Sequence, residues 1–553
     1  MRRLSLVAIF ALFFGISLSS FHIVQAQQTN PYASSVSQYN LSVAIQSEKR
    51  IIETTGTWRL PAISKDTNQL DFYLSPKMQN LNVQVLEPKL SDDAVSLTSE
   101  EAGGDTKWTL KTNQPIPAGQ SVLLQFSYVS ETKPAPQFNI SAEGSFAGGG
   151  GELWYPQTSF SNRETGTLRF QVPAGEMVVS NGALQSSLEQ QAKGEFVFGV
   201  NAPSKFGFAS GKYAVLRRAG KVPFTLYLLR PKENSQTVLD GCAKALDFLT
   251  SLFGEFPYQQ FSLVEVDFRS AVAGTSEYGF ILADDSQFDK GFNLAYWAHE
   301  FGHQWWGNLI RGTPKTSGQM MLTEGMAQFG GLLAIEHIEG AEAAAQFRHC
   351  GYQNYNKNQS AAGYFQLASA GTEFPLTTDI PKDQKETLLM HRLANSKGFI
   401  LLDMLSRQIG REKFAAILRK FIQQKANQTA SWQDLQKAIE ADAGQDIHWF
   451  FEQWFERTGA PDYQITWKQT GKRIQGFITQ PSPFYRATLE IELKGSKRSL
   501  IKTIEVNGER TPFNWSAPFK VNDVVLDPSY KVLRWTREFR TKSDVSTDAK
   551  KAN

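Results

Sequence analysis

The strongest chemical signal in the chain is the run His299-Glu300-Phe301-Gly302-His303. Two histidines at positions i and i+4 of a helix lie one turn apart on one face, where both imidazoles can bind one metal ion. Neutral imidazoles are ligands of catalytic zinc, which keeps one position open for water. Glu300 lies between the two ligands, where it can take a proton from that water. The pattern therefore predicts zinc-assisted hydrolysis.

The composition makes a chance match to this motif rare. The chain has 7 histidines in 553 residues, so an accidental His-Glu-x-x-His has odds on the order of one in a few hundred. The alternative is an ordinary amphipathic helix with two surface histidines. Tyr296, Trp297, Trp305 and Trp306 bracket the motif, which favours a buried helix, although aromatic bulk alone indicates only a core.

A third ligand is expected from Glu324, which follows His303 after 20 intervening residues and is the first acidic residue after it. Residues 308–318 are rich in Gly, Pro, Thr and Lys and predict a turn. Residues 322–338 predict a second helix with Glu324 in its first turn. A helix–loop–helix can return this carboxylate to the two imidazoles and complete a site for one Zn²⁺. The alternative role of Glu324 is to stabilise the helix start through the helix dipole.

Length and composition restrict the number of domains and the classes of binding partner. A chain of 553 residues is too long for one core, and about three domains are expected. The composition is that of globular proteins, with 41% hydrophobic and 20% charged residues. A net charge of +3 indicates neither nucleic acid nor an anionic membrane as a partner.

The first 26 residues have the pattern of a secretory signal peptide. Arg2 and Arg3 precede the apolar residues 4–18, and Val24-Gln25-Ala26 offers a small-x-small cleavage site. We therefore expect export to the periplasm or out of the cell. The alternative is a single N-terminal membrane anchor, for which the apolar stretch is short. No later segment is apolar enough to suggest a membrane span after signal cleavage.

The two cysteines, Cys242 and Cys350, leave their pairing open. An exported protein can use a disulfide, and both residues fall in helix-like segments of the middle region. Two buried free thiols are an equally good interpretation, because the sequence does not say how far apart these segments lie.

Periodicity along the chain predicts a multidomain α+β fold. Residues 39–214 alternate apolar and polar positions in short runs, which predicts an N-terminal all-β domain at 36–215. The glycine run at 148–151 predicts a flexible loop. Helical periodicity dominates from residue 292 to about 457, where Ser431 followed by Asp434 predicts a helix N-terminus.

Alternation then returns, which predicts a small C-terminal β-sandwich. The expected organisation is a signal peptide at 1–26, the β domain at 36–215, a mostly helical catalytic domain at 220–458, the small β-sandwich at 461–540 and a flexible tail at 541–553.

Several separated segments resemble one family. The run from His299 to Asn308 is close to the zinc helix of the gluzincin zinc aminopeptidases typified by aminopeptidase N, and Leu322-Thr-Glu-Gly-Met-Ala is close to their third-ligand segment. Gly274-Thr-Ser-Glu277-Tyr corresponds to the Gly-x-Met-Glu-Asn strand of that family. Over residues 39–535 the resemblance implies a thermolysin-like catalytic domain, one Zn²⁺ and peptide substrates with a free N-terminus. Glu277 and Gly274 would be substrate-binding residues, and Glu277, with help from Glu324, would hold the α-amine.

The chain departs from this family at three places. The loop between His303 and Glu324 is two residues longer, which is a small change in loop entropy. Glu277 keeps the charge of the family's glutamate, while the residues beside it differ from those of the family. Most seriously, Asn395 stands where the family has the tyrosine whose hydroxyl stabilises the oxyanion. Removing one oxyanion donor reduces hydrolase rates by about 10²–10³. Asn395 and His391, one turn earlier, are the candidate replacement donors, although His391 also fits an ordinary helix-surface histidine.

These observations leave three functional hypotheses. The leading one is an exported zinc aminopeptidase, with His299, His303 and Glu324 as ligands and Glu300 as general base. A second keeps the zinc chemistry but acts as an endopeptidase or on another electrophile. The third is a catalytically attenuated peptide-binding protein that retains the zinc site, which the presence of Glu300 argues against.

Overall fold

The computed structural model describes residues 36–90, 95–149, 151–158, 163–269, 273–289, 291–351 and 357–540. The predicted signal peptide and C-terminal tail lie outside these residues. The chain forms two compact units, the first holding the chain up to Ala243 together with Phe256–Phe292, and the second holding Lys244–Glu255 and the chain from Asn293 onward. Within the described ranges, none of the helices combines the length and the apolar character that a membrane crossing requires.

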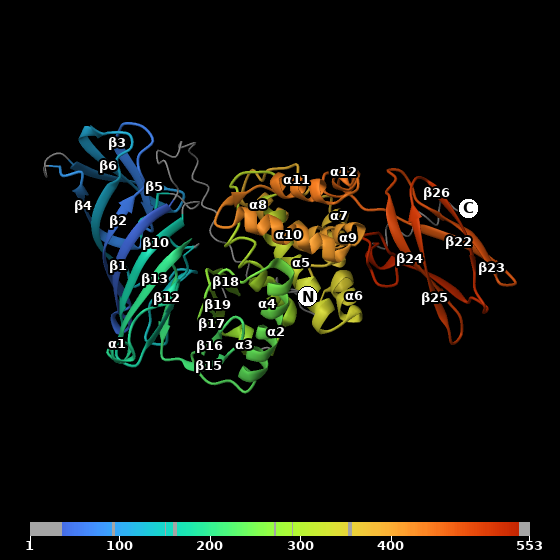
Figure 1. The fold of residues 1–553 in the computed structure, drawn as a ribbon, viewed down its shortest axis with the longest axis horizontal. Helices are drawn as coiled ribbons and strands as arrows, with labels where there is room; N and C mark the ends of the chain where they lie inside the picture. Colours follow the sequence, from blue (N-terminus) through green and yellow to red (C-terminus); the bar gives the residue numbers. More distant parts are fainter. Residues whose placement is uncertain are drawn as a thin grey trace, which may run out of the picture. The chain divides into compact units, whose positions relative to one another are not determined.

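The first unit is built mainly from β-sheets (Figure 1). A seven-stranded sheet has the order β12-β13-β10-β1-β2-β7-β4, and a three-stranded sheet has the order β3-β6-β5. Strand β1 pairs with β2 in antiparallel and with β10 in parallel orientation. The strands of these two sheets are β1 (Val36–Gln46), β2 (Ile51–Leu60), β3 (Thr67–Leu74), β4 (Met78–Glu87), β5 (Val95–Ala102), β6 (Asp105–Ile116), β7 (Val122–Ser130), β10 (Arg163–Gln171), β12 (Ala183–Leu184) and β13 (Glu195–Ser204).

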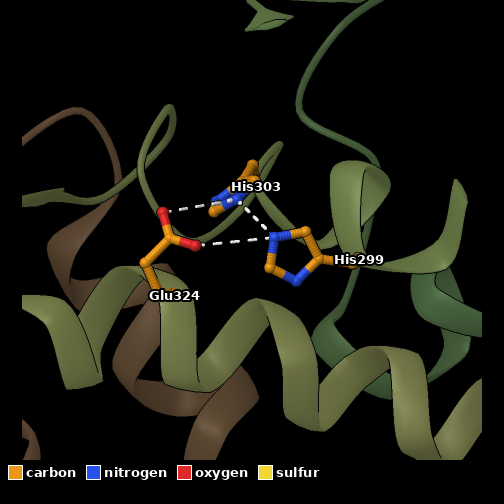
Figure 2. Close-up of side chains that lie close together, drawn as sticks. All are labelled: His299, His303 and Glu324. Atoms are coloured by element: carbon orange, nitrogen blue, oxygen red, sulfur yellow. Dashed lines mark hydrogen bonds and ion pairs between the residues drawn. The ribbon is translucent and has the colours of Figure 1, made fainter. Parts of the chain in front are cut away.

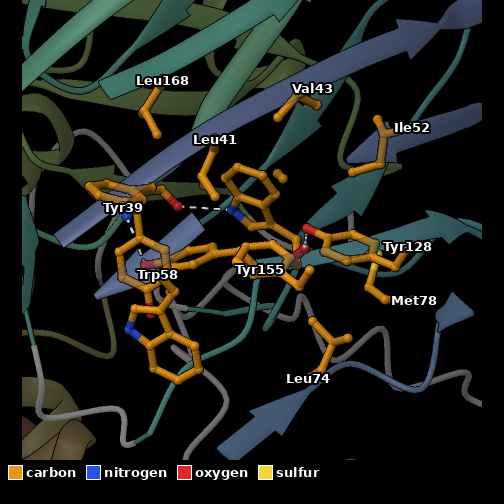
Figure 3. Close-up of a cluster of buried hydrophobic side chains, with 14 of the residues drawn as sticks. Tyr39, Leu41, Val43, Ile52, Trp58, Leu74, Met78, Tyr128, Tyr155 and Leu168 are labelled. Carbon is orange, nitrogen blue, oxygen red and sulfur yellow. Dashed lines mark hydrogen bonds between the residues drawn. The ribbon is translucent and has the colours of Figure 1, made fainter. Parts of the chain in front are cut away.

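The hydrophobic core of this part draws side chains from both sheets (Figure 3). Strand β1 alternates as predicted, with Tyr39, Leu41 and Val43 buried. The ring of Trp58 on β2 stacks on Tyr39 with centroids 5.3 Å apart, and it meets the ring of Phe72 on β3 edge-on at 5.9 Å. These aromatic contacts join the seven-stranded sheet to the three-stranded one. The predicted β-rich character of the N-terminal part is confirmed, and the described residues there also include the short helix α1 (Leu188–Ala192) and a 3₁₀ helix at Ser47–Lys49.

Two further sheets complete the first unit, with the orders β11-β14-β9-β8 and β15-β16-β17-β19-β18. Strands β16, β17 and β19 run parallel, and β18 is an antiparallel edge strand. Edge strand β18 carries Gly274 and Glu277. The elements of this part are β8 (Phe138–Asn139), β9 (Ser145–Ala147), β11 (Met177–Ser180), β14 (Phe208–Gly211), β15 (Ala214–Arg218), β16 (Phe224–Leu228), α2 (Ser235–Phe253), β17 (Phe261–Val266), β18 (Gly274–Glu277), β19 (Phe280–Asp284) and α3 (Ser286–Asp289).

The helices predicted after residue 292 are present in the second unit. Ser431 and Asp434 form the expected capping box at the start of α11. Two π-helical turns, Met321–Gly325 and Ala394–Gly398, interrupt the α-helices. The helices and short strands are α4 (Leu294–Gly302), β20 (Arg311–Gly312), α5 (Met326–Ile338), α6 (Ala341–Cys350), α7 (Ala361–Ser369), α8 (Gln384–Leu393), α9 (Phe399–Ile409), α10 (Arg411–Lys425), β21 (Thr429–Ala430), α11 (Trp432–Asp442) and α12 (His448–Trp454).

Two three-stranded sheets follow in the second unit, with the orders β22-β23-β26 and β25-β24-β27. Strand β24 alternates, with Leu489, Ile491 and Leu493 fully buried. This agrees with the predicted small β domain at the C-terminal end. The strands are β22 (Gln464–Thr470), β23 (Arg473–Thr479), β24 (Ala487–Lys494), β25 (Ser499–Val506), β26 (Arg510–Ser516) and β27 (Asp523–Leu526).

The predicted domain boundaries stay predictions. Strand β15 pairs with β16 across residues 219–223, so the five-stranded sheet begins at the predicted break between 215 and 220. Helix α2 extends from the first unit into the second. Cys242 on this helix is buried and Cys350 is partly buried, and both are free thiols in the structure.

Candidate metal centre

Helix α4 presents the two histidines of the motif. Its N-terminus is capped by the side chain of Asn293, whose Oδ1 accepts a hydrogen bond from the Tyr296 amide at 3.1 Å. His299 lies in the last turn of the helix, and His303 is the C-cap residue with right-handed helical dihedral angles. Because the helical path continues to His303, the two imidazoles face the same side, and their Nε2 atoms are 3.2 Å apart.

Helix α5 and the π-helical turn before it return Glu324 to these imidazoles. A continuous helix over residues 322–338 was predicted, whereas the structure has a π-helical turn at Met321–Gly325 followed by α5. Nothing in the side-chain periodicity marks this turn, although π-helical segments occur frequently at functional sites. Gly302 allows α4 and α5 to approach closely, since a Cβ atom there would lie 2.9 Å from the Cα atom of Ala327.

His299, His303 and Glu324 form a compact triangle of donor atoms (Figure 2). In addition to the 3.2 Å between the two Nε2 atoms, His299 Nε2 is 3.5 Å from Glu324 Oε2, and His303 Nε2 is 3.7 Å from Glu324 Oε1. Bonds of 2.0–2.1 Å at tetrahedral angles separate two ligand atoms by about 3.3 Å. Two imidazoles and a carboxylate at these separations fit a zinc ion, as the sequence predicted.

The position of His303 is further fixed by a backbone acceptor. Its Nδ1 atom is 3.0 Å from the carbonyl oxygen of Trp306. A carbonyl oxygen only accepts, so Nδ1 carries the proton and donates it, and Nε2 keeps its lone pair for a metal. Sequence reasoning assigned Trp306 only to the aromatic core. Its carbonyl group could not be recognised from the sequence, because it reaches Nδ1 only through the turn that follows α4.

The electrostatics of the centre follow from burial and from opposite charges. Burial alone would raise the pKa of Glu324, but the imidazoles of His391 and His303 outweigh it and hold that pKa well below its usual range. Burial lowers the pKa of His299, and the hydrogen bond with Glu324 overcomes this effect and raises it. Burial raises the pKa of Glu300, which is 6% exposed.

Asn395 and His391, the candidate oxyanion donors, both contact Glu324. Asn395 lies in the π-helical turn Ala394–Gly398 and is fully buried, with its Nδ2 atom 3.1 Å from Glu324 Oε2. His391, in the last turn of α8, places Nε2 at 3.1 Å from the same oxygen. The structure thus brings both residues to the ligand set, and their role as oxyanion donors stays a prediction.

Glu277 and Gly274, the predicted substrate-binding residues, belong to β18 in the first unit. The Glu277 carboxylate is 2% exposed, and both its oxygens lie 3.2 Å from the backbone nitrogen of Gly149. A Cβ atom at Gly148 would lie 3.2 Å from Oε1, and one at Gly207 would lie 3.0 Å from Oε2. Glycine backbone therefore approaches this carboxylate closely, and the Thr275 hydroxyl lies 3.5 Å from Oε1. The run at 148–151 was interpreted only as a flexible loop, whereas Gly149 donates to Glu277.

Residues 239–454 match the Peptidase family M1 domain. Over 382 residues the chain is 23% identical to "Probable aminopeptidase 1" of Sulfurisphaera tokodaii, covering 63% of this chain and 47% of the relative. Over 410 residues it is 23% identical to "Leucyl aminopeptidase" of Saccharolobus solfataricus, covering 66% and 50%. The chain thus spans about half the length of these curated relatives.

Solved structures share the fold. Legionella pneumophila aminopeptidase A, crystallised in complex with aspartic acid, aligns with a TM-score of 0.64 at 16% identity, covering 90% of this chain and 59% of that one. The M1 zinc metallopeptidase from Deinococcus radiodurans aligns with a TM-score of 0.59 at 16% identity, covering 77% and 94%. At this identity the likeness shows the fold alone.

The segment that matches the family model contains the whole donor triangle. The helical second unit and the flanking β-sheets follow the architecture of the M1 structures. Residues 239–454 therefore carry a Peptidase family M1 domain, and the aminopeptidase relatives and the shared fold support the predicted likeness of the chain to the aminopeptidase N-like gluzincin family.

Proposed function

We propose that this chain is a zinc aminopeptidase that removes residues from the free N-terminus of peptides. The observation that carries the proposal is the donor triangle of His299, His303 and Glu324, whose separations of 3.2, 3.5 and 3.7 Å fit a single tetrahedral zinc ion. Glu300, between the two histidines, is a buried carboxylate that a purely structural metal site has no use for. The family match and the aminopeptidase relatives support the same reading.

The roles of the residues follow from their chemistry. His299, His303 and Glu324 would hold the zinc, which when bound polarises the scissile carbonyl as a Lewis acid. Glu300 would take a proton from the attacking water on its carboxylate and pass it to the nitrogen of the leaving amine. Glu277 would pair with the α-ammonium group of the substrate. Burying a charged carboxylate without a partner costs free energy, so this contact would favour substrates with a free amine.

We also propose export of the chain across a membrane. The support is the sequence of residues 1–26, with its basic start, apolar centre and small-x-small end. Fractionation of cells that express the full chain, with N-terminal sequencing of the product, tests this. A mature N-terminus at Gln27 outside the cytoplasm is expected, and a cytoplasmic product that keeps Met1 would contradict export.

The activity is tested with matched peptides that carry a free or an acetylated N-terminus. We expect hydrolysis of the free-amine peptide only, loss of activity with a chelator and recovery with zinc. Glu300→Gln should lower kcat about 10²–10⁴-fold while zinc content, measured by elemental analysis, stays at the wild-type level. The control is Glu342→Gln, at an exposed glutamate in the first turn of α6, which should leave both quantities unchanged.

Two results would contradict the proposal in different ways. Equal cleavage of acetylated and free-amine peptides, or cleavage at internal bonds, would indicate an endopeptidase. Equal and negligible activity of wild type and Glu300→Gln at full zinc occupancy would indicate a peptide-binding protein that keeps the metal.

A further inference from the structure

One oxygen of the proposed metal ligand Glu324 is contacted by two side-chain donors from outside the metal-binding motif. Asn395 Nδ2 lies 3.1 Å from Glu324 Oε2, and His391 Nε2 lies 3.1 Å from the same atom. Both come from the end of α8 and the π-helical turn after it.

The orientation of the Asn395 amide follows from its neighbours. Its nitrogen faces two acceptors, Glu324 Oε2 at 3.1 Å and the carbonyl oxygen of His391 at 3.2 Å; it also lies 3.4 Å from His391 Nε2, which itself donates to Glu324 and accepts nothing. An amide nitrogen carries two hydrogens, and these two contacts use both. A flipped amide would place its own oxygen against both acceptors, so these contacts fix which amide atom is the nitrogen and which is the oxygen.

This arrangement leaves Asn395 without a donor for the substrate. Its remaining polar atom, the buried Oδ1, has no hydrogen-bond partner among the described residues. That atom is an acceptor, and an acceptor cannot stabilise negative charge that develops on a carbonyl oxygen. The imidazole of His391 is likewise engaged, since it must donate from Nε2 to approach a carboxylate oxygen at 3.1 Å.

The backbone supports these contacts through the close approach of two π-helical turns. A Cβ atom at Gly398, at the end of one turn, would meet the Met321 Sδ atom of the other at 2.4 Å, and a Cβ atom at Gly325 would meet the Met321 methyl carbon at 2.8 Å. Both glycines lie against the end of the Met321 side chain. The two turns therefore pack closely enough for the short side chain of Asn395 to reach Glu324.

We infer that Asn395 and His391 are positioning residues that hold the Glu324 carboxylate in the orientation required for metal binding, in place of the predicted role as oxyanion donors. Rotation about the last side-chain bond of a glutamate is soft, and two donors on Oε2 fix it. Partners that orient a metal ligand typically change metal affinity by 10–100-fold when mutated. The inference rests on the metal site of the proposed function.

The test measures zinc affinity directly, by competition with a chromophoric chelator on the full chain. Asn395→Leu and His391→Leu remove one donor each and should weaken zinc binding about 10–100-fold. His391→Gln keeps an N–H donor and should recover part of the loss. The control is Ser396→Ala in the same π-helical turn, where the hydroxyl bonds the Arg392 carbonyl at 2.7 Å; its zinc affinity should match wild type. Circular dichroism of the metal-free variants verifies the fold. Asn395→Ser is a second variant at this position, with a smaller side chain than leucine.

The outcomes separate this inference from the function on which it rests. Wild-type zinc affinity in Asn395→Leu and His391→Leu, with kcat lowered, would mean that these residues act on the reaction and would overturn the positioning role while the aminopeptidase stands. Absence of zinc binding by the wild-type protein would overturn the proposed metal site itself. Weakened zinc affinity in both variants, with Ser396→Ala unchanged, supports the inference.

Discussion

Glu324 and Glu277 are both buried carboxylates, but their surroundings change their pKa values in opposite directions. Glu324 has imidazoles around it, and those of His391 and His303 hold its pKa well below the usual range despite burial. Burial raises the pKa of Glu277 to about 7, because the Gly149 amide and the Thr275 hydroxyl compensate only in part. The substrate ammonium group of the proposed function would favour the charged form of Glu277.

The raised pKa of Glu277 predicts a pH dependence of stability. Between about pH 4.5 and 7 the native chain keeps a proton that the unfolded chain has lost. The free energy of unfolding should therefore fall as pH rises through this window, by about 3 kcal/mol in total. Glu277→Gln should remove this decline and be more stable than wild type at pH 8, as measured by urea denaturation across the pH range.

Glu195→Gln, at an exposed glutamate on β13, is the matched control and should follow the wild-type pH profile. A Glu277→Gln variant whose profile also parallels wild type would show that Glu277 is ionised throughout the range.

Helices α4 and α5 determine the geometry of the metal centre through the closeness of their backbones. Gly302 on α4 faces Ala327 on α5, and Gly331 lies one turn further along α5, beside the backbone of His299. The two glycines differ in the space available. A Cβ atom at Gly302 would lie 2.9 Å from Ala327 Cα, whereas one at Gly331 would have its first contacts at 3.6 Å.

Alanine at these two positions should have opposite effects. Gly302→Ala must push α4 away from α5, which should destabilise the protein by about 1–3 kcal/mol and weaken zinc binding. Gly331→Ala fits without a clash and gains up to about 1 kcal/mol of helix propensity. Urea denaturation and chelator competition measure both effects. Equal stability of the two variants would mean that α4 and α5 are not packed as closely as described.

The second unit joins its helices to its C-terminal sheets through a buried ion pair. Lys397, fully buried in the π-helical turn Ala394–Gly398, donates to Glu373 Oε1 at 2.6 Å and to the Arg457 carbonyl at 2.9 Å. The amide of Gly459 donates to Glu373 Oε2 at 2.8 Å. Arg457 and Gly459 lie in the segment between α12 and β22, so the turn that carries Asn395 is anchored to the start of the small β domain.

Breaking this pair should be costly. Lys397→Met leaves the Glu373 carboxylate buried without its cation and should destabilise the second unit by about 3–5 kcal/mol. Lys420→Met is the control, because Lys420 forms an equally short 2.6 Å ion pair with Asp442 on the surface, where such pairs contribute about 0–1 kcal/mol. Urea denaturation followed by tryptophan fluorescence measures both. A loss in Lys397→Met no larger than in Lys420→Met would contradict the anchoring role.

Much of the fold could be predicted because its signals are local. The alternation at Tyr39, Leu41 and Val43 predicted an inward-facing strand, and Ser431 with Asp434 predicted a helix start; the structure contains both. The π-helical turns could not be predicted, since no side-chain period distinguishes them from an α-helix. The sheet that crosses the predicted break also depends on a distant partner, because β16 pairs not only with the neighbouring β15 but also with β17, which begins at Phe261.

For the site, the sequence by itself determined the ligand types and the spacing of His299 and His303, because a helix places residues four apart on one face. Only the tertiary structure decided what stands around them. Glu324 comes close to the two imidazoles because α4 contacts α5. The Trp306 carbonyl determines the tautomer of His303, and the packing of two π-helical turns brings the donors to Glu324. The contacts of Glu324 join segments that the chain brings together only when it folds. The Trp306 contact is local, but it is made by a backbone carbonyl through the turn after α4, so no side-chain pattern records it.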